Sequence, residues 1–187
     1  MNWHFDLLAS VYDHAIAAPD PARLAAALRL PTPGLLLDAG GGTGRVAAAL
    51  HTQIGQWVIS DLSAPMLAQA QAKGVALPLR ALAERLPFAD ATFDRVLAVD
   101  ALHHFADQRL ALAELVRVLK PGGRIVIEEP DIRRASVKLV ALAEKLALMG
   151  SHFASPQRIS SLLAANGLSA TIEDDGQFNA WVLADKP

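Results

Sequence analysis

The sequence predicts a single α/β domain built on a mostly parallel β-sheet. Its 187 residues, 52% of them hydrophobic, suit one domain with one substantial core. Five short apolar runs alternate with helical patterns, and two further runs near the carboxyl terminus flank an Asp-Gly step that is typical of a hairpin turn. Alternating strands and helices give parallel strands with right-handed crossovers, so we expect a ligand site at the carboxyl ends of the strands.

Apolar periodicity sets the order of the elements. We expect buried strands at residues 35–37, 57–59, 75–79, 95–99 and 124–127, and helices at 45–50, 64–73 and 109–119, the last ended by residues 120–123. Residues 1–33, with a helical segment at 21–30, are expected to form a small N-terminal cap, and 34–187 the binding core of the same domain, 1–187. Residues 168–173 and 178–183 are expected to close the sheet as an antiparallel pair.

Composition and charge exclude several classes of function. There are 17 basic and 19 acidic residues and no basic run, so we expect no nucleic acid as the principal partner. The absence of cysteine excludes disulfides, thiolate zinc sites and cysteine nucleophiles. The amino-terminal residues lack the pattern of a signal peptide, and no apolar run is long enough to span a membrane, so we expect a soluble, cytoplasmic protein.

A glycine-rich loop follows the first predicted strand. The strand runs through Asp38 into Gly40, Gly41, Gly42 and Gly44, where missing Cβ atoms let a ligand approach the backbone. Arg45 occupies the third glycine position of a dinucleotide fingerprint, and the Gly-Lys-Ser/Thr sequence of a P-loop is absent. A carboxylate directly before the glycines repels a pyrophosphate and attracts an ammonium or sulfonium group. The loop therefore suits a cationic ligand.

Asp61 lies 21 residues after Gly40, directly after the second predicted strand. Folds of this kind place a carboxylate on a ribose diol at about this distance. The alternative interpretation makes the glycines a tight turn and Asp61 a cap of the helix that begins near Ala64.

With these motifs the sequence resembles the class I S-adenosylmethionine-dependent methyltransferases, most closely the small ubiquinone/menaquinone-type C-methyltransferase branch. The resemblance covers nearly the whole chain and lies in residues 5–6, 12–13, 37–44, 61–63, 66–67, 84–88, 93–94, 102–105 and 114–124. It implies a Rossmann-like, doubly wound sheet of seven strands, with S-adenosylmethionine as cofactor and S-adenosylhomocysteine as product.

The resemblance also assigns the parts of the cofactor. Asp38 and the glycines Gly40, Gly41, Gly42 and Gly44 would hold the methionine part, Asp61 the ribose, and Leu62 with Met66 one face of the adenine. Asp100, after the fourth strand, is also assigned to the cofactor site. Relatives often carry an acid followed by alanine to receive the adenine amino group, whereas this chain has Leu82 and Ala83 there, with the next acid at Glu84. Adenine recognition then rests on the Ala83 backbone or on a shift of Glu84.

Methyl transfer from a sulfonium depends mainly on aligning the acceptor, so a general base is optional. The candidate catalytic residues are His104, His103 and Tyr12. Their structural alternatives are a buried hydrogen-bonded spacer for His104, ordinary packing for Tyr12, and a short-helix N-cap for Asp100. Acids after the fifth strand, Glu128, Glu129 and Asp131, could face the acceptor, although charged residues at a strand exit are more often solvated. We expect no metal, because adjacent histidines would not easily ligate one ion.

Residues 133–149 predict an amphipathic helix with three possible roles: a lid over an apolar acceptor, a membrane-surface helix in transient contact with lipid, or a helix that covers the sheet. The leading hypothesis for the whole protein is S-adenosylmethionine-dependent C- or O-methylation of a small, apolar or aromatic molecule. The alternatives are a catalytically silent cofactor-binding partner or regulatory protein, and a nicotinamide oxidoreductase, which Arg45 and the lack of a substrate domain disfavour.

Overall fold

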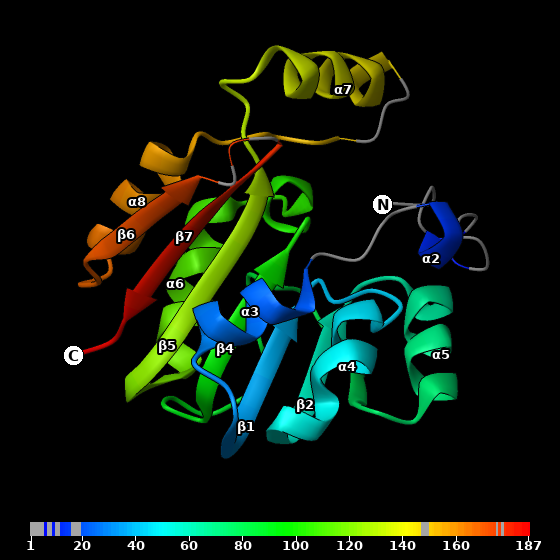
Figure 1. Cartoon of the computed structure of the whole chain (residues 1–187), viewed down its shortest axis with the longest axis vertical. Coiled ribbons are helices and arrows are strands. Elements are labelled where there is room, and N and C mark those ends of the chain that lie inside the picture. The colour runs from blue at the N-terminus through cyan, green and yellow to red at the C-terminus, as the bar shows by residue number, and fades with distance from the viewer. Residues whose placement is uncertain are drawn as a thin grey trace.

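A computed structural model describes residues 6, 9, 12–15, 20–146, 150–174, 176 and 178–187. Its centre is a seven-stranded sheet in the order β3-β2-β1-β4-β5-β7-β6 (Figure 1). The first five strands are parallel, and β7 runs antiparallel to both β5 and β6. The predicted fold class and the terminal hairpin are therefore confirmed. The strands are β1 (Thr32–Ala39), β2 (Ile54–Asp61), β3 (Leu77–Arg80), β4 (Phe93–Val99), β5 (Leu119–Pro130), β6 (Ala170–Asp174) and β7 (Asn179–Asp185).

Helices cover both faces of the sheet because successive strand residues point to opposite sides. Leu36 packs with the core formed by α3, α4 and α5, whereas Leu37 packs with the core formed by α6 and α8. These helices are α3 (Pro21–Leu28), α4 (Arg45–Leu50), α5 (Ala64–Lys73), α6 (Gln108–Val118) and α8 (Pro156–Ala164). Short elements complete the described chain: α2 (Tyr12–Ala15) and the 3-10 turns η1 (His51–Gln53) and η2 (Leu102–His104).

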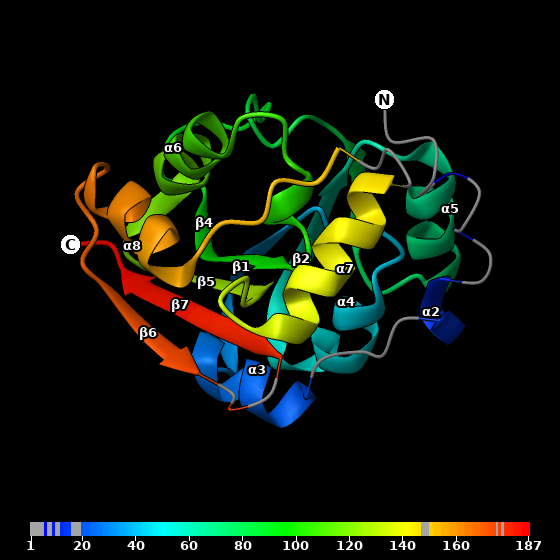
Figure 2. The same cartoon turned by 90° about the horizontal axis from the view of Figure 1, so that it is seen from above.

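The predicted helix at 133–149 is observed as α7 (Ala135–Leu146), and residues 147–149 lie outside the described part of the chain. It does not cover a face of the sheet, as one interpretation of the sequence held. It lies above the edge formed by the carboxyl ends of the parallel strands, and the view from above shows it crossing that edge (Figures 1 and 2). No helix among the described residues is both long and apolar enough to cross a membrane.

Two further differences concern the end of the sheet. Strand β5 continues to Pro130, so Glu128 and Glu129 lie inside the strand instead of after it. Helix α8 has no counterpart among the predicted elements. Its start is nevertheless marked by Ser155, whose hydroxyl accepts a hydrogen bond from the Arg158 N–H, and by Pro156 in the first turn.

Candidate cofactor and acceptor site

A cavity of about 450 Å³ lies at the carboxyl ends of the strands, where the chain leaves the neighbouring strands β1 and β4 toward opposite halves of the sheet. It lies within the size range of small-molecule sites. The residues that line it include all but one of the predicted cofactor residues: Asp38, Gly40, Gly41, Gly42, Asp61, Leu62, Met66, Leu82, Ala83 and Asp100. Tyr12 and His104 also line it, whereas Gly44 and His103 are not among its lining residues.

The glycine loop brings backbone to the cavity where side chains would fill it. Gly40 and Gly42 have φ values of +73° and +52°, a region that favours glycine. A Cβ on Gly41 would lie 2.6 Å from Asp38 Cγ, so only glycine fits against that carboxylate. Gly44 has a different role: it is the N-cap of α4, and a Cβ there would lie 3.0 Å from Ile59 Cδ1 at the back of the loop.

Asp38 is a buried carboxyl group at the cavity, and burial strongly affects its ionisation. Its side chain lines the cavity although the residue is 1% exposed, and its Oδ2 has no hydrogen-bond partner among the described residues. Burial raises the pKa of Asp38 to about 7, although the positive charge of Arg45 and the nearby Trp57 side chain act to lower it. A cationic ligand group beside Asp38 would add to the positive charge of Arg45 and stabilise the charged carboxylate.

Asp61 ends β2 and holds the loop to the start of α5. Its Oδ2 accepts a hydrogen bond from the Gly42 N–H at 3.0 Å, and its Oδ1 accepts one from the Ser63 N–H at 2.8 Å. Ser63 is the N-cap of α5 and accepts from the Met66 N–H, so the interpretation of Asp61 as the cap itself is wrong. Burial raises the pKa of Asp61. Each carboxylate oxygen has lone pairs left for a pair of vicinal hydroxyls.

Apolar side chains border the part of the cavity assigned to adenine. Leu62 and Leu82 are 45% and 46% exposed, whereas Met66 is buried. Glu84 also lines the cavity, and its Oε1 accepts a hydrogen bond from the Asp107 N–H at 3.1 Å. A planar apolar ring bound here would cover the two exposed leucines.

Arg45 and Asp100 form an ion pair that the sequence did not reveal. Arg45 Nη2 lies 2.8 Å from Asp100 Oδ2, and the Arg45 guanidinium lies 5.9 Å from the centre of the Tyr12 ring. Burial, followed by the nearby Glu129 charge, raises the pKa of Asp100. The N-cap residue of η2 is Ala101, so the alternative in which Asp100 caps that short helix is wrong.

The acids at the end of β5 are buried, which corrects the expectation that they are solvated. Glu129 Oε1 accepts hydrogen bonds from the N–H groups of Ala101 and Leu102 at 2.9 and 2.7 Å, and its Oε2 lies 2.6 Å from His103 Nδ1. Burial acts to lower the pKa of His103, but Glu129 outweighs it and the pKa is raised. Glu129 therefore fixes the turn that follows β4.

The neighbours of Glu129 complete this buried acidic group. Asn179 donates a hydrogen bond to Glu128 at 2.7 Å, and burial raises the pKa of Glu128 to about 7. Asp131, 2% exposed, is paired with Arg133 at 2.6 Å. None of these three acids lines the cavity.

His104 presents a neutral imidazole to the cavity. Burial, followed by the charge of His103, lowers its pKa to about 3. Its Nδ1 lies 3.2 Å from Ser151 Oγ. Burial raises the pKa of Tyr12, so its phenol also stays protonated at neutral pH. These two side chains and Phe105 line the cavity in addition to the residues assigned to the cofactor.

The residues present fit S-adenosylmethionine. The unpartnered Asp38 oxygen and the open glycine backbone suit the cationic methionine part, Asp61 suits the ribose, and the exposed leucines suit the adenine. Asp38, Asp61 and Asp100 place three carboxyl groups at the cavity, and in their charged form they favour a cationic ligand over a pyrophosphate.

Comparison with known proteins agrees with this fit. The family model described as "Methyltransferase domain" matches residues 37–127. Over 169 residues the chain is 32% identical to a demethylmenaquinone methyltransferase of Thermus thermophilus, covering 75% of this chain and 77% of that protein. It is 38% identical over 104 residues to the ubiquinone/menaquinone biosynthesis C-methyltransferase UbiE of Haemophilus ducreyi, but this match covers 50% of this chain and only 40% of that protein.

Among solved structures, the [4+2]-cyclase SpnF superposes with a TM-score of 0.80 at 18% identity, covering 100% of this chain and 95% of that one. At this identity the likeness supports the fold alone. The family follows from the sequence match over three quarters of the chain together with the site geometry. The chain belongs to the S-adenosylmethionine-dependent methyltransferases.

Proposed function

We propose that the protein methylates a small, uncharged, aromatic or apolar molecule at carbon or oxygen, with a quinol or phenol as the representative acceptor. The observation that supports this most directly is the set of side chains that line the cavity in addition to the predicted cofactor residues. Phe105, the neutral imidazole of His104 and the protonated phenol of Tyr12 border it there. Arg45 and Arg80 both line the cavity; Arg45 is paired with Asp100 at 2.8 Å, and Arg80 Nε donates a hydrogen bond to the Leu62 carbonyl at 2.9 Å. Such surroundings favour an aromatic ring with a hydroxyl group over a charged acceptor.

The name of the Thermus thermophilus relative supports the same acceptor class, because demethylmenaquinone is a quinone. That relative matches over 77% of its own length, whereas the chain spans less than half of the UbiE protein of Haemophilus ducreyi. The acceptor is therefore proposed as a class and not as one compound.

Positioning is the main contribution that we assign to the protein. S-adenosylmethionine supplies a methyl group on a sulfonium, which is already an activated leaving group. Asp38 balances the cationic part of the cofactor, and Asp61 fixes the ribose. The glycine loop lets these two parts of the cofactor approach the backbone. Holding the acceptor beside the methyl group in a fixed orientation can then account for much of the rate.

A strong general base is not part of this proposal. An imidazole whose pKa is about 3 accepts protons weakly at neutral pH, so His104 borders the acceptor without acting as a general base. Tyr12 closes the cavity from the amino-terminal side. His103 stabilises the turn η2, which carries His104, through its contact with Glu129.

Helix α7 is proposed to cover the acceptor part of the site. Val137 is fully buried, so one side of the helix is anchored, while Leu139 and Leu142 are 69% and 55% exposed. Because the helix crosses the carboxyl edge of the sheet, an apolar acceptor would pass beneath or beside it (Figure 2). The exposed leucines also offer a surface for transient contact with a lipid-like acceptor.

The test is product formation. The purified protein is incubated with methyl-labelled S-adenosylmethionine and, separately, a naphthoquinol, a simple phenol, a carboxylic acid and an oligonucleotide. We expect labelled product with the quinol or phenol only, and no product from Asp61→Ala. The exposed Asp90→Ala serves as the matched control. Product from the charged acceptors alone, or cofactor binding without turnover on any acceptor, would refute the proposal.

A further inference from the structure

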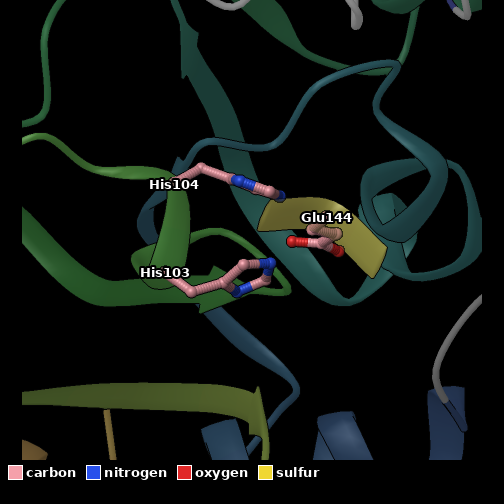
Figure 3. Close-up of side chains that lie close together, drawn as sticks. All are labelled: His103, His104 and Glu144. Atoms are coloured by element: carbon pink, nitrogen blue, oxygen red, sulfur yellow. The ribbon is translucent and has the colours of Figure 1, made fainter. Parts of the chain in front are cut away.

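We propose that His103, His104 and Glu144 form a binding site for one divalent transition-metal ion, and that Zn²⁺ is the ion this ligand set suits. The turn η2 provides the two histidines and α7 provides Glu144. One ligand atom from each of the three side chains lies within 4.8 Å of the other two. Figure 3 shows the carboxylate of Glu144 facing the two imidazole rings.

The sequence predicts no metal because adjacent histidines do not easily ligate one ion, but this argument does not hold for the 3-10 turn η2. Consecutive side chains on an extended strand point to opposite sides, which would keep two adjacent histidines from one ion. In η2 the rings of His103 and His104 instead lie together, with their centres 3.9 Å apart and their planes at 48°. Both rings can therefore offer nitrogen to the same point.

Each imidazole ring has a hydrogen-bonding partner at Nδ1, the ring nitrogen that is not assigned to the metal. His103 Nδ1 lies 2.6 Å from Glu129 Oε2, which leaves Nε2 as the metal-facing nitrogen. A carboxylate behind a ligating histidine is the usual outer partner in metal sites. His104 Nδ1 lies 3.2 Å from Ser151 Oγ, and donation of the Nδ1 proton to that hydroxyl would turn Nε2 of His104 into the metal ligand.

Glu144 provides the second, independent observation. Its Oε2 is buried and has no hydrogen-bond partner among the residues that the structure describes. A buried carboxylate oxygen without a partner is costly. A bound cation facing the two imidazoles would satisfy it.

The ligand chemistry selects the ion. Two imidazole nitrogens and one carboxylate oxygen suit Zn²⁺, whereas Ca²⁺ and Mg²⁺ prefer oxygen ligands only. Bonds of about 2.1 Å to a common ion would bring the ligand atoms to about 3.4 Å from one another, so movements of roughly 1 Å would close the site. Three protein ligands leave a fourth position for water or a ligand oxygen, and His104 lines the cavity. The ion would also tie α7 to η2.

Direct metal binding tests the inference without any methyl acceptor. The full-length protein, stripped with chelator, is titrated with Zn²⁺ against a chromogenic competitor, and separately with Co²⁺ while visible absorption is recorded. We expect one Zn²⁺ per chain and Co²⁺ bands of a four- or five-coordinate site. Binding should weaken at least tenfold in Glu144→Gln and in His104→Ala. The matched controls Glu173→Gln and His51→Ala, both at exposed residues, should bind as the wild type does.

Circular dichroism and S-adenosylhomocysteine titration of the same samples show that each variant is folded and retains the cofactor site. No saturable binding by the folded wild type would overturn the inference. Equal binding by the wild type and by both ligand variants would also overturn it. Failure of cofactor binding with intact Zn²⁺ binding would count against the proposed function alone.

Discussion

Replacing Asp38 by asparagine should remove a large part of the pH dependence of folding stability. Burial raises the pKa of this carboxyl from 3.8 to about 7, so it takes up a proton on folding between these values. A group with a raised folded-state pKa contributes stability that is fully present below its unfolded pKa and is lost as the pH rises through the folded value. For a shift of about 3 units, roughly 2 to 3 kcal/mol of this contribution is lost between pH 5 and pH 8.

The measurement is urea unfolding of the ligand-free wild type and Asp38→Asn, followed by circular dichroism at pH 5, 6, 7 and 8. The free energy of unfolding of the variant, relative to the wild type, should rise by roughly 2 to 3 kcal/mol from pH 5 to pH 8. Other titrating groups are common to both proteins and largely cancel in the difference. The exposed Asp90→Asn is the control and should show no such trend.

The same ionisation should control ligand affinity. Because the charged form of Asp38 balances a cationic ligand, wild-type affinity for S-adenosylhomocysteine should rise by up to about tenfold from pH 6 to pH 8, and Asp38→Asn should stay flat. A stability difference between wild type and variant that does not change with pH would refute the assignment of Asp38 as a buried, proton-binding carboxyl.

Three further substitutions test the structure of the site. Gly41→Ala should weaken S-adenosylhomocysteine binding at least tenfold in calorimetry, because its Cβ would lie 2.6 Å from Asp38 Cγ. Gly74→Ala, whose φ of +67° strains the end of α5 but whose Cβ would meet no atom within 4 Å, should lower stability without changing binding. Leu82→Asp should strengthen binding by about fivefold if a carboxylate there accepts the adenine amine, and equal or weaker binding would place the amine elsewhere. Glu129→Gln should lower the free energy of unfolding by about 1 to 3 kcal/mol, since it supports two backbone N–H groups and His103. An effect of that size in the exposed Glu173→Gln would contradict this reason.

Local patterns predicted most of the fold. The helix at Ala64–Lys73 has the predicted bounds because a serine cap precedes it and Gly74 follows it in a left-handed conformation. The apolar run at 124–127 located β5 but not its extent. Glu128 and Glu129 are charged, which is typical of a loop, yet both are buried within the strand. Their burial depends on Asn179 and on the turn after β4, which are distant in sequence.

In the candidate site, too, some features can be predicted from the sequence and others depend on tertiary packing. The loop from Asp38 and the carboxylate of Asp61 are recognisable in sequence, because their spacing reflects one strand, one helix and the next strand. The Arg45–Asp100 pair and the approach of Glu144 to the histidines depend on where α4 and α7 lie above the sheet. No periodicity of the sequence specifies such contacts between distant segments.

The most direct test of the central claim is calorimetric titration of the purified protein with S-adenosylhomocysteine, run beside NADH. Asp61→Ala and the control Asp90→Ala are titrated in parallel. The account predicts saturable one-to-one binding of S-adenosylhomocysteine alone, retained in Asp90→Ala and lost in Asp61→Ala. Saturable NADH binding, or S-adenosylhomocysteine binding unchanged in Asp61→Ala, would contradict it.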